Sequence, residues 1–214
     1  MYNPTAPKIL NDIVEFLQQA KIQISENVEG EGRGGSLKDE GTIKRLLQSN
    51  PKFKNLILDV PARRPGDMLV KDYKTGDVYP VNIKTSIGSA DNAMSKLGFL
   101  FALTDIKYED LPGRIDWKKF DKLLKERGAD VPGKDYWYLC IDKNDSSNVI
   151  IRGCKQINCW IENANPANLL QINWNKEKTM PPAARTYKEA HNLIVLGIAR
   201  CFKKAFNNIP DDWK

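Results

Sequence analysis

The sequence predicts one domain of the α/β or α+β class, in which a mixed central sheet is flanked by helices. Three observations lead to this fold class. Apolar residues recur at helical spacing near both ends, a β-hairpin pattern lies in the first half of the chain, and two strongly apolar strands follow it. The chain has 214 residues, which suits a single domain, and 41% of them are hydrophobic, which is enough for a sizeable core.

Composition narrows the choice of partner and compartment. The formal net charge of +6 favours an anionic partner, although the basic residues are spread along the chain. No apolar run approaches the roughly 18 residues of a membrane span, and no signal-peptide pattern opens the chain, so we expect a cytoplasmic protein without a membrane partner. The cysteines Cys140, Cys154, Cys159 and Cys201 lack C-x-x-C spacing and His191 is the only histidine, which disfavours a structural zinc site and histidine-based acid–base chemistry.

Two helices are predicted ahead of the hairpin. Residues 7–25 carry apolar side chains three and four positions apart, which indicates a helix that faces the core. The glycine-rich stretch 29–35 is read as a loop, and it lacks the G-K-[ST] ending of a nucleotide-binding P-loop. Ser36 then opens a second helix with a capping pattern, and this helix ends before Pro51. A short strand is expected within residues 53–60.

Residues 66–85 predict a β-hairpin. Two segments rich in apolar and β-branched residues are separated by the turn-forming residues 74–77. Because strand side chains alternate between the two faces, Asn82 and Lys84 share one face. The apolar residues beside them point the other way and can be buried.

The register of this hairpin brings three polar groups together. If the chain folds about Thr75, Asp67 lies opposite Ile83 and therefore beside both Asn82 and Lys84. Two oxygen ligands can hold Mg²⁺, and a lysine next to the ion can orient or deprotonate one of its waters. This is the equipment for metal-assisted hydrolysis of phosphodiesters. The alternative is an ordinary hairpin with a polar, solvated face.

The motif Pro65-Gly66-Asp67, followed after the hairpin by Asn82-Ile83-Lys84, resembles the PD-(D/E)XK nuclease signature. The layout over about residues 36–104 is similar to that of type II restriction endonucleases. The resemblance implies a restriction-endonuclease-like core in which Asp67 and Asn82 bind Mg²⁺, with Mn²⁺ as a substitute, and Lys84 assists the attacking water. Asn82 stands where the family usually has Asp or Glu, which removes one negative charge and predicts weaker metal binding.

Further site residues follow from the same resemblance. Glu40, in the first turn of the second predicted helix, matches by position an acidic residue that often reaches the metal site. The alternative is a solvated acid that stabilises the helix N-terminus. Candidate DNA contacts are Arg33, Arg63, Arg64, Thr85, Ser86, Ser89, Asn92 and Lys96. The three arginines would suit phosphate contacts, or they are simply loop charges.

Periodicity and turn residues predict the rest of the fold. The predicted elements are a core helix over 91–104, a basic amphipathic helix over 115–127, strands over 135–142 and 148–152, and a closing helix over 187–207. Residues 160–185 are expected to be irregular. Their asparagines and arginine could read base edges, or the stretch is a surface connector.

Together these features predict a single nuclease domain over residues 1–214. Its catalytic core would span about 36–155, and a candidate DNA-reading and C-terminal helical region about 156–214. The resemblance implies a sequence-specific, Mg²⁺-dependent type II restriction endonuclease of the bacterial or archaeal cytoplasm, acting as a homodimer on two-fold symmetric double-stranded DNA. Two alternatives stay open: a structure-specific repair or junction-resolving nuclease with the same site, and a catalytically silent DNA-binding module in which Asn82 does not replace a carboxylate.

Overall fold

The structure is a computed structural model that describes residues 5–20, 22–24, 32–86, 90–92, 95–163 and 170–207, with the side chains of 32–36 and 90–92 excepted. The helices of this part of the chain are α1 (Lys8–Gln19), α2 (Gly32–Ser49), α3 (Lys96–Leu103), α4 (Trp117–Arg127), α5 (Trp174–Glu177) and α6 (Tyr187–Asn207). Among the described residues, no helix is long and apolar enough to cross a membrane.

A five-stranded mixed sheet forms the centre of the molecule, with strand order β1-β2-β3-β5-β6. The strands are β1 (Ile57–Leu58), β2 (Met68–Lys71), β3 (Val78–Ser86), β5 (Trp137–Asp142) and β6 (Val149–Gly153). β3 and β5 run parallel, and the other neighbours run antiparallel. The predicted mixed sheet flanked by helices is therefore confirmed.

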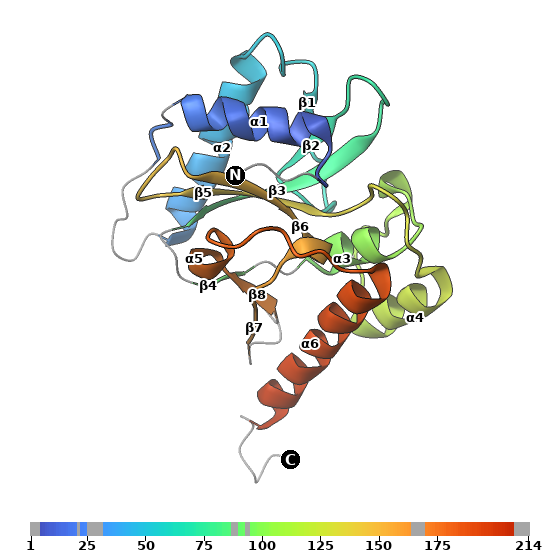
Figure 1. Ribbon diagram of the computed structural model, residues 1–214. Helices are drawn as coiled ribbons and strands as arrows, with labels where there is room; N and C mark the ends of the chain where they lie inside the picture. The colour runs from blue at the N-terminus through green and yellow to red at the C-terminus, as the bar shows by residue number, and fades with distance from the viewer. Residues whose placement is uncertain are drawn as a thin grey trace.

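Helices and a second sheet cover the two faces of the central sheet (Figure 1). α1 and α2 lie over one face, while α3, α6 and the second sheet lie on the other side. Alternate residues of β5 belong to different clusters: Trp137 and Leu139 pack with α1 and α2, and Tyr138 and Cys140 pack with α3 and α6. A strand buried on both faces needs an almost continuous apolar run, which explains the composition of residues 136–141.

The second sheet is small and antiparallel, with strand order β4-β8-β7. Its strands are β4 (Ala90–Asn92), β7 (Trp160–Glu162) and β8 (Leu170–Asn173). The expectation of an irregular 160–185 is thus wrong, since this stretch contains β7, β8 and α5. The predicted helix over 91–104 is also too long. The Ser95 side chain accepts a hydrogen bond from the backbone N–H of Gly98 at 3.0 Å, which caps the helix and fixes its start at Lys96.

The glycine-rich segment also differs from its prediction. α2 begins at Gly32, so the second half of the expected 29–35 loop is helical, whereas residues 29–31 lie outside the described part of the chain. Glycine is a weak helix former, and here it extends a helix whose buried apolar residues, Ile43 and Leu47, come later in the sequence.

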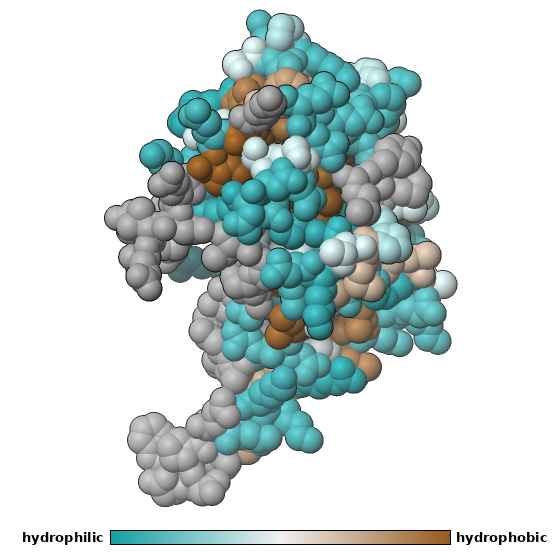
Figure 2. Space-filling model, turned by 60° about the vertical axis from the view of Figure 1, so that its left-hand side comes forward, coloured by the Kyte–Doolittle hydropathy of each residue, from teal (hydrophilic) through white to brown (hydrophobic). Residues whose placement is uncertain are grey.

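Several other elements match their predictions. α4 begins after the Asp116 cap, whose carboxylate accepts the Lys119 N–H at 2.7 Å, and α6 spans the residues expected of the closing helix. None of the four cysteines, all of which lie in the described part of the chain, forms a disulfide, and three of them are buried. Figure 2 shows hydrophilic residues over most of the face drawn, with apolar residues in separate patches.

Candidate active site

The hairpin formed by β2 and β3 has a register one residue away from the prediction. Met68 pairs with Val81 and Leu69 with Pro80, so Asp67 continues the pairing opposite Asn82, not opposite Ile83. The turn explains this shift.

The Asp72 side chain holds the hairpin turn. Its Oδ1 accepts the backbone N–H groups of Lys74 at 2.7 Å and Thr75 at 3.3 Å, and its carbonyl accepts the N–H of Gly76 at 3.0 Å. Gly76 has a φ of 76°, a conformation that glycine adopts easily. These bonds centre the turn between Lys74 and Thr75 instead of on Thr75.

Asp67 is fixed by two hydrogen bonds to β3. Its backbone N–H donates to the carbonyl of Val81 at 2.9 Å, and its Oδ2 accepts the backbone N–H of Ile83 at 2.7 Å. Gly66 makes this approach possible, because its φ is 107° and a Cβ there would lie 3.3 Å from the Val81 carbonyl oxygen. The glycine between Pro65 and Asp67 is therefore required by the backbone.

The faces of β3 follow the predicted alternation. Val81 and Ile83 are buried with α1 and α2, whereas Asn82 and Lys84 are partly exposed on the opposite face. One atom of Asn82 is unusual: its Oδ1 is buried and has no hydrogen-bond partner among the residues that the structure describes. A buried amide oxygen without a donor costs free energy unless another group occupies its lone pairs.

Glu40 joins this group from α2, which packs against β3. Burial raises the pKa of Glu40 to about 7. The negative charge of Asp67 adds to this rise, and the positive charge of Lys84 opposes it. Because α2 begins at Gly32, Glu40 lies more than two turns inside the helix. The alternative role for Glu40, stabilising the helix N-terminus, is therefore wrong.

Asp67 responds to the same neighbours. Burial raises its pKa, while the hydrogen bond from Ile83 and the charges of Lys84 and Lys44 lower it. The structure thus brings Glu40, Asp67 and Lys84 within electrostatic range of one another, with Asn82 beside them.

These residues fit a hard divalent cation. Carboxylate and amide oxygens are the ligands that Mg²⁺ takes in proteins, and the orphaned Asn82 Oδ1 is an oxygen that a cation would satisfy. In the part of the chain that the structure describes, no three His, Cys, Asp or Glu residues form a metal-binding group. The candidate set is instead two carboxylates, Glu40 and Asp67, with one amide oxygen.

The candidate DNA contacts on β3, Thr85 and Ser86, are engaged or buried within the protein. The Thr85 hydroxyl donates to Oδ2 of Asp39 at 3.1 Å, on the α2 side of the strand. Ser86 is only 2% exposed. The side chains of Arg33 and Asn92, and all of Ser89, lie outside the described residues.

Three other candidate DNA contacts, Arg63, Arg64 and Lys96, lie in the described part of the chain. Arg64 donates to the carbonyl of Glu109 at 2.8 Å and so ties the loop before Asp67 to the chain after α3. Arg63 is exposed and has a φ of 64°. Lys96 lies over the ring of Trp117, 5.0 Å from its centroid. Of these three, only Arg63 presents an exposed cation next to the motif.

Two tyrosines near the site were not singled out by the sequence. The Tyr108 hydroxyl donates to the carbonyl of Pro65 at 2.9 Å, which steadies the turn into Asp67. Tyr136 is buried, and its side chain interacts with both Asn82 and Asp67. The sequence indicated only that the aromatic residues of β5 are core, because the parallel pairing with β3 joins residues 56 positions apart, such as Asn82 and Tyr138.

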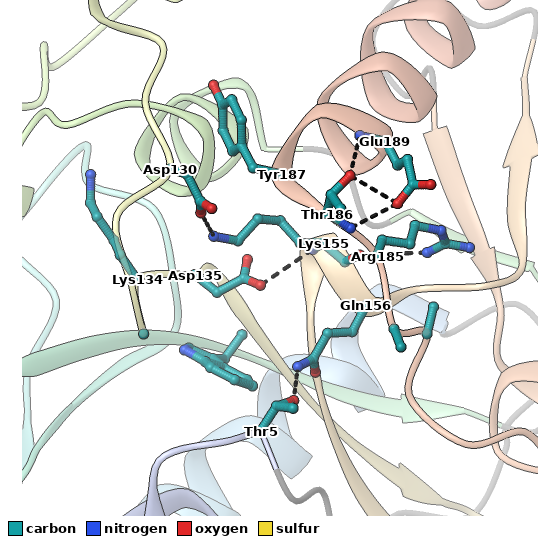
Figure 3. A pocket seen from close by; sticks show the side chains of 14 residues that line it. Thr5, Asp130, Lys134, Asp135, Lys155, Gln156, Arg185, Thr186, Tyr187 and Glu189 are labelled. Atoms are coloured by element: carbon teal, nitrogen blue, oxygen red, sulfur yellow. Dashed lines mark hydrogen bonds and ion pairs between the residues drawn. The ribbon is translucent and has the colours of Figure 1, made fainter.

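A separate cavity of about 580 Å³ lies beside the start of β5 (Figure 3). Burial raises the pKa of Asp135 in its wall to about 6, and this carboxylate accepts the backbone N–H groups of Tyr136 at 2.8 Å and Lys155 at 3.3 Å. Arg185 donates to the carbonyl of Ile157 at 2.6 Å. Asp135 and Arg185 are thus engaged in hydrogen bonds to the backbone that forms the walls of the cavity. We therefore place the candidate site at the hairpin and not in this cavity.

Comparison with known proteins gives no further guide to the site. Neither the models of protein families nor the curated proteins contain a match to this chain.

Proposed function

We propose that this chain is a type II restriction endonuclease of the PD-(D/E)XK superfamily, which hydrolyses phosphodiester bonds in double-stranded DNA with Mg²⁺. The observation that carries the proposal is the grouping of Asp67, Asn82 and Lys84 on one hairpin with Glu40 from α2 beside them. Mn²⁺ is expected to substitute for Mg²⁺.

Each residue has a role that follows from its chemistry. A divalent ion at this site would act as a Lewis acid and lower the pKa of a bound water. Asp67 and Glu40 would hold the ion with their carboxylates, and Asn82 with its amide oxygen. Lys84 would orient the attacking water and stabilise the negative charge that develops on the phosphate.

Near neutral pH, the charge of the site depends on whether Glu40 is protonated. With a pKa of about 7, Glu40 is neutral in a large fraction of molecules at pH 7. Asn82 adds no charge, so Asp67 is the only carboxylate among the four site residues besides Glu40. This site should therefore bind its cation more weakly than a site with three carboxylates.

The proposed partner is double-stranded DNA, and the proposed assembly is a homodimer. The net charge of +6 supports an anionic partner such as DNA. All four site residues fall in the proposed catalytic core, about 36–155, whereas β7, β8, α5 and α6 fall in the proposed DNA-reading region, about 156–214. We place the protein in the cytoplasm as a homodimer. Leu196 and Phe206 of α6, both 54% exposed, offer an apolar surface to a second copy.

Plasmid cleavage tests this function. Purified protein is incubated with a large plasmid and Mg²⁺, beside folded Asp67→Ala and Lys84→Ala variants. Discrete fragments from the parent protein and none from the variants support a sequence-specific nuclease. A smear indicates a non-specific enzyme, and preferential cutting of branched DNA indicates a junction-resolving one. DNA binding without cleavage by the parent protein indicates a silent binding module and overturns the proposal.

A further inference from the structure

A buried carboxylate joins α2 to the central sheet. Asp39 is 2% exposed, and its Oδ2 accepts a hydrogen bond from the Thr85 hydroxyl at 3.1 Å. The same oxygen lies 3.3 Å from Nζ of Lys143, whose side chain is only 10% exposed. One acid of the helix thus meets a hydroxyl and an ammonium group of the sheet. We call Asp39, Thr85 and Lys143 the α2 clamp.

The two sheet residues of the clamp are held next to each other by strand pairing. Thr85 lies in β3, and Lys143 directly follows β5. The parallel pairing of these strands extends to Ser86 and Asp142, and the backbone N–H of Lys143 then donates to the carbonyl of Ser86 at 3.0 Å. The clamp therefore attaches the helix to two strands whose relative position is already fixed.

Asp39 occupies a helix position where packing alone would favour an apolar residue. Asp39, Ile43 and Leu47 follow one another at intervals of four and so share one face of α2, and both apolar residues are fully buried. Thr85 likewise continues the face of β3 that packs in the same cluster. A buried ion pair is often no more stabilising than apolar residues of similar volume. Its hydrogen bonds do, however, fix a direction that apolar packing leaves free.

The clamp adjoins the candidate active site on both of its sides. Asp39 precedes Glu40 in α2, and Thr85 follows Lys84 in β3. Among the described side chains of α2 that come before Ile43, Asp39 is the only buried one. The clamp is therefore the buried contact that fixes this half of the helix, and with it Glu40, against β3.

We propose that the α2 clamp positions Glu40 so that its carboxylate can bind a divalent cation together with Asp67. This inference rests on the proposed function, because it assumes that the site holds such an ion. It also gives Thr85 a role other than a contact to DNA, since its hydroxyl is engaged by the clamp. Groups that support metal ligands commonly contribute about 10–100-fold to metal affinity.

Removal of the clamp lysine separates positioning from simple electrostatics by the sign of the effect. Lys143→Met deletes a positive charge, which by Coulomb attraction alone should tighten the binding of a cation. Loss of the clamp should instead weaken Mn²⁺ binding, by about tenfold. Electron paramagnetic resonance of the free ion measures this affinity and reports weak sites as well as tight ones.

Thr85→Val breaks the clamp without a change of charge. It removes the hydroxyl at nearly constant shape, so Mn²⁺ binding should weaken in the same direction, and Thr85→Ser, which keeps the hydroxyl, should restore it. This pair of variants also keeps the test open if Lys143→Met does not fold.

Two control variants remove charged contacts of α2 outside the clamp. Lys44→Met deletes a lysine of the same helix that pairs with Asp59, whose side chain is 85% exposed, so Mn²⁺ binding should stay unchanged or tighten. Asp12→Asn changes another buried carboxylate, 6% exposed, which lies 3.1 Å from Nζ of Lys52 beyond the opposite end of α2. Its melting temperature should fall while its Mn²⁺ affinity stays unchanged.

A Glu40→Gln background tests whether the clamp acts through Glu40. Glutamine keeps an oxygen at this position, so weak Mn²⁺ binding stays measurable. In this background Thr85→Val should change the affinity by less than about twofold, the margin within which independent effects add. Lys143→Met should no longer weaken binding.

The clamp and the proposed function fail in different ways. Unchanged or tighter Mn²⁺ binding in a folded Lys143→Met or Thr85→Val variant, or an equal loss with and without Glu40, overturns the clamp while Mn²⁺ binding and DNA cleavage by the parent protein stand. A parent protein that binds no Mn²⁺ overturns the proposed function, and the inference falls with it.

Discussion

Asp67 and Ile83 are joined by a 2.7 Å hydrogen bond, in which the backbone N–H of Ile83 donates to Oδ2 of the carboxylate. The bond lies where β3 continues past the beginning of β2, which starts at Met68 opposite Val81. At that edge the Ile83 N–H has no strand partner, and the carboxylate takes the place of one. The hydrogen bond that replaces strand pairing at Ile83 therefore also orients Asp67 toward the proposed site.

Gly66→Ala should lower both stability and activity. The φ of 107° and the nearby Val81 carbonyl make a side chain there unfavourable by about 1–3 kcal/mol. Gly76→Ala is the matched control, because Gly76 also has a positive φ but no atom of the described residues lies within 4 Å of an added Cβ. The melting temperature should fall for both variants, whereas the rate of DNA cleavage should fall only for Gly66→Ala. Equal cleavage by the two would argue against a role for Gly66 in placing Asp67.

Lys84→Gln should slow the chemical step while leaving DNA binding within a few-fold of the parent protein. The lysine acts on charge that develops during the reaction, and removing one such group typically costs about 10²–10³ in rate. Single-turnover cleavage measures the step directly. Lys71→Gln, an exposed lysine on β2 of the same sheet, serves as control. A Lys84→Gln variant that cuts at the parent rate would exclude this role.

Metal binding should become tighter as the pH rises through about 7. Glu40 must lose its proton to serve as a ligand, and its pKa is raised to about 7. Below that pH, Mn²⁺ affinity should rise by up to about tenfold per pH unit, and above it should level off. Calorimetric titrations from pH 5.5 to 8.5 give the profile. Glu40→Gln should flatten it, and a profile that Glu40→Gln leaves unchanged would remove Glu40 from the ligand set.

In metal-free buffer, ionisation of Glu40 should lower the stability of the folded protein as the pH rises, whereas metal binding should strengthen over the same range. Its pKa is raised in the folded state from 4.5 to about 7, so the native protein holds the proton more tightly. The resulting stabilisation is present below about pH 4.5 and is lost as the pH rises through about 7. Glu40→Gln should therefore melt higher than the parent protein at pH 8, by a few degrees at most, because the carboxyl is partly exposed and solvent screens it.

Local sequence signals predicted the hairpin well, but not its register. The turn residues and β-branched strands identify the hairpin, and alternation places Asn82 and Lys84 on one face. The one-residue shift comes from the hydrogen bonds of Asp72 and the positive φ of Gly76. The geometry of such a turn depends on which side chains accept hydrogen bonds from its backbone N–H groups. The same residues are compatible with several turn types, so the sequence alone does not fix the register.

Non-local pairing explains what the sequence could not show. The second sheet joins Ala90 to Asn173 with strands of three and four residues, too short to give a clear period-two pattern. Glu40 was placed near the site only by resemblance, and its contact depends on how α2 packs against β3. Tyr136 reaches Asn82 through a parallel strand pair, and no local feature indicates which strands pair.

The most direct test of the proposed site is Mg²⁺-dependent plasmid cleavage by the parent protein and by Asp67→Asn, measured side by side. The amide can still accept the Ile83 N–H, so the variant should fold with a similar melting temperature. We predict discrete fragments from the parent protein and a loss of cleavage of at least about 100-fold in the variant, since one of the two carboxylate ligands is gone. A parent protein that does not cut, or a folded Asp67→Asn variant that cuts as fast, would contradict the assignment of this hairpin as a nuclease site.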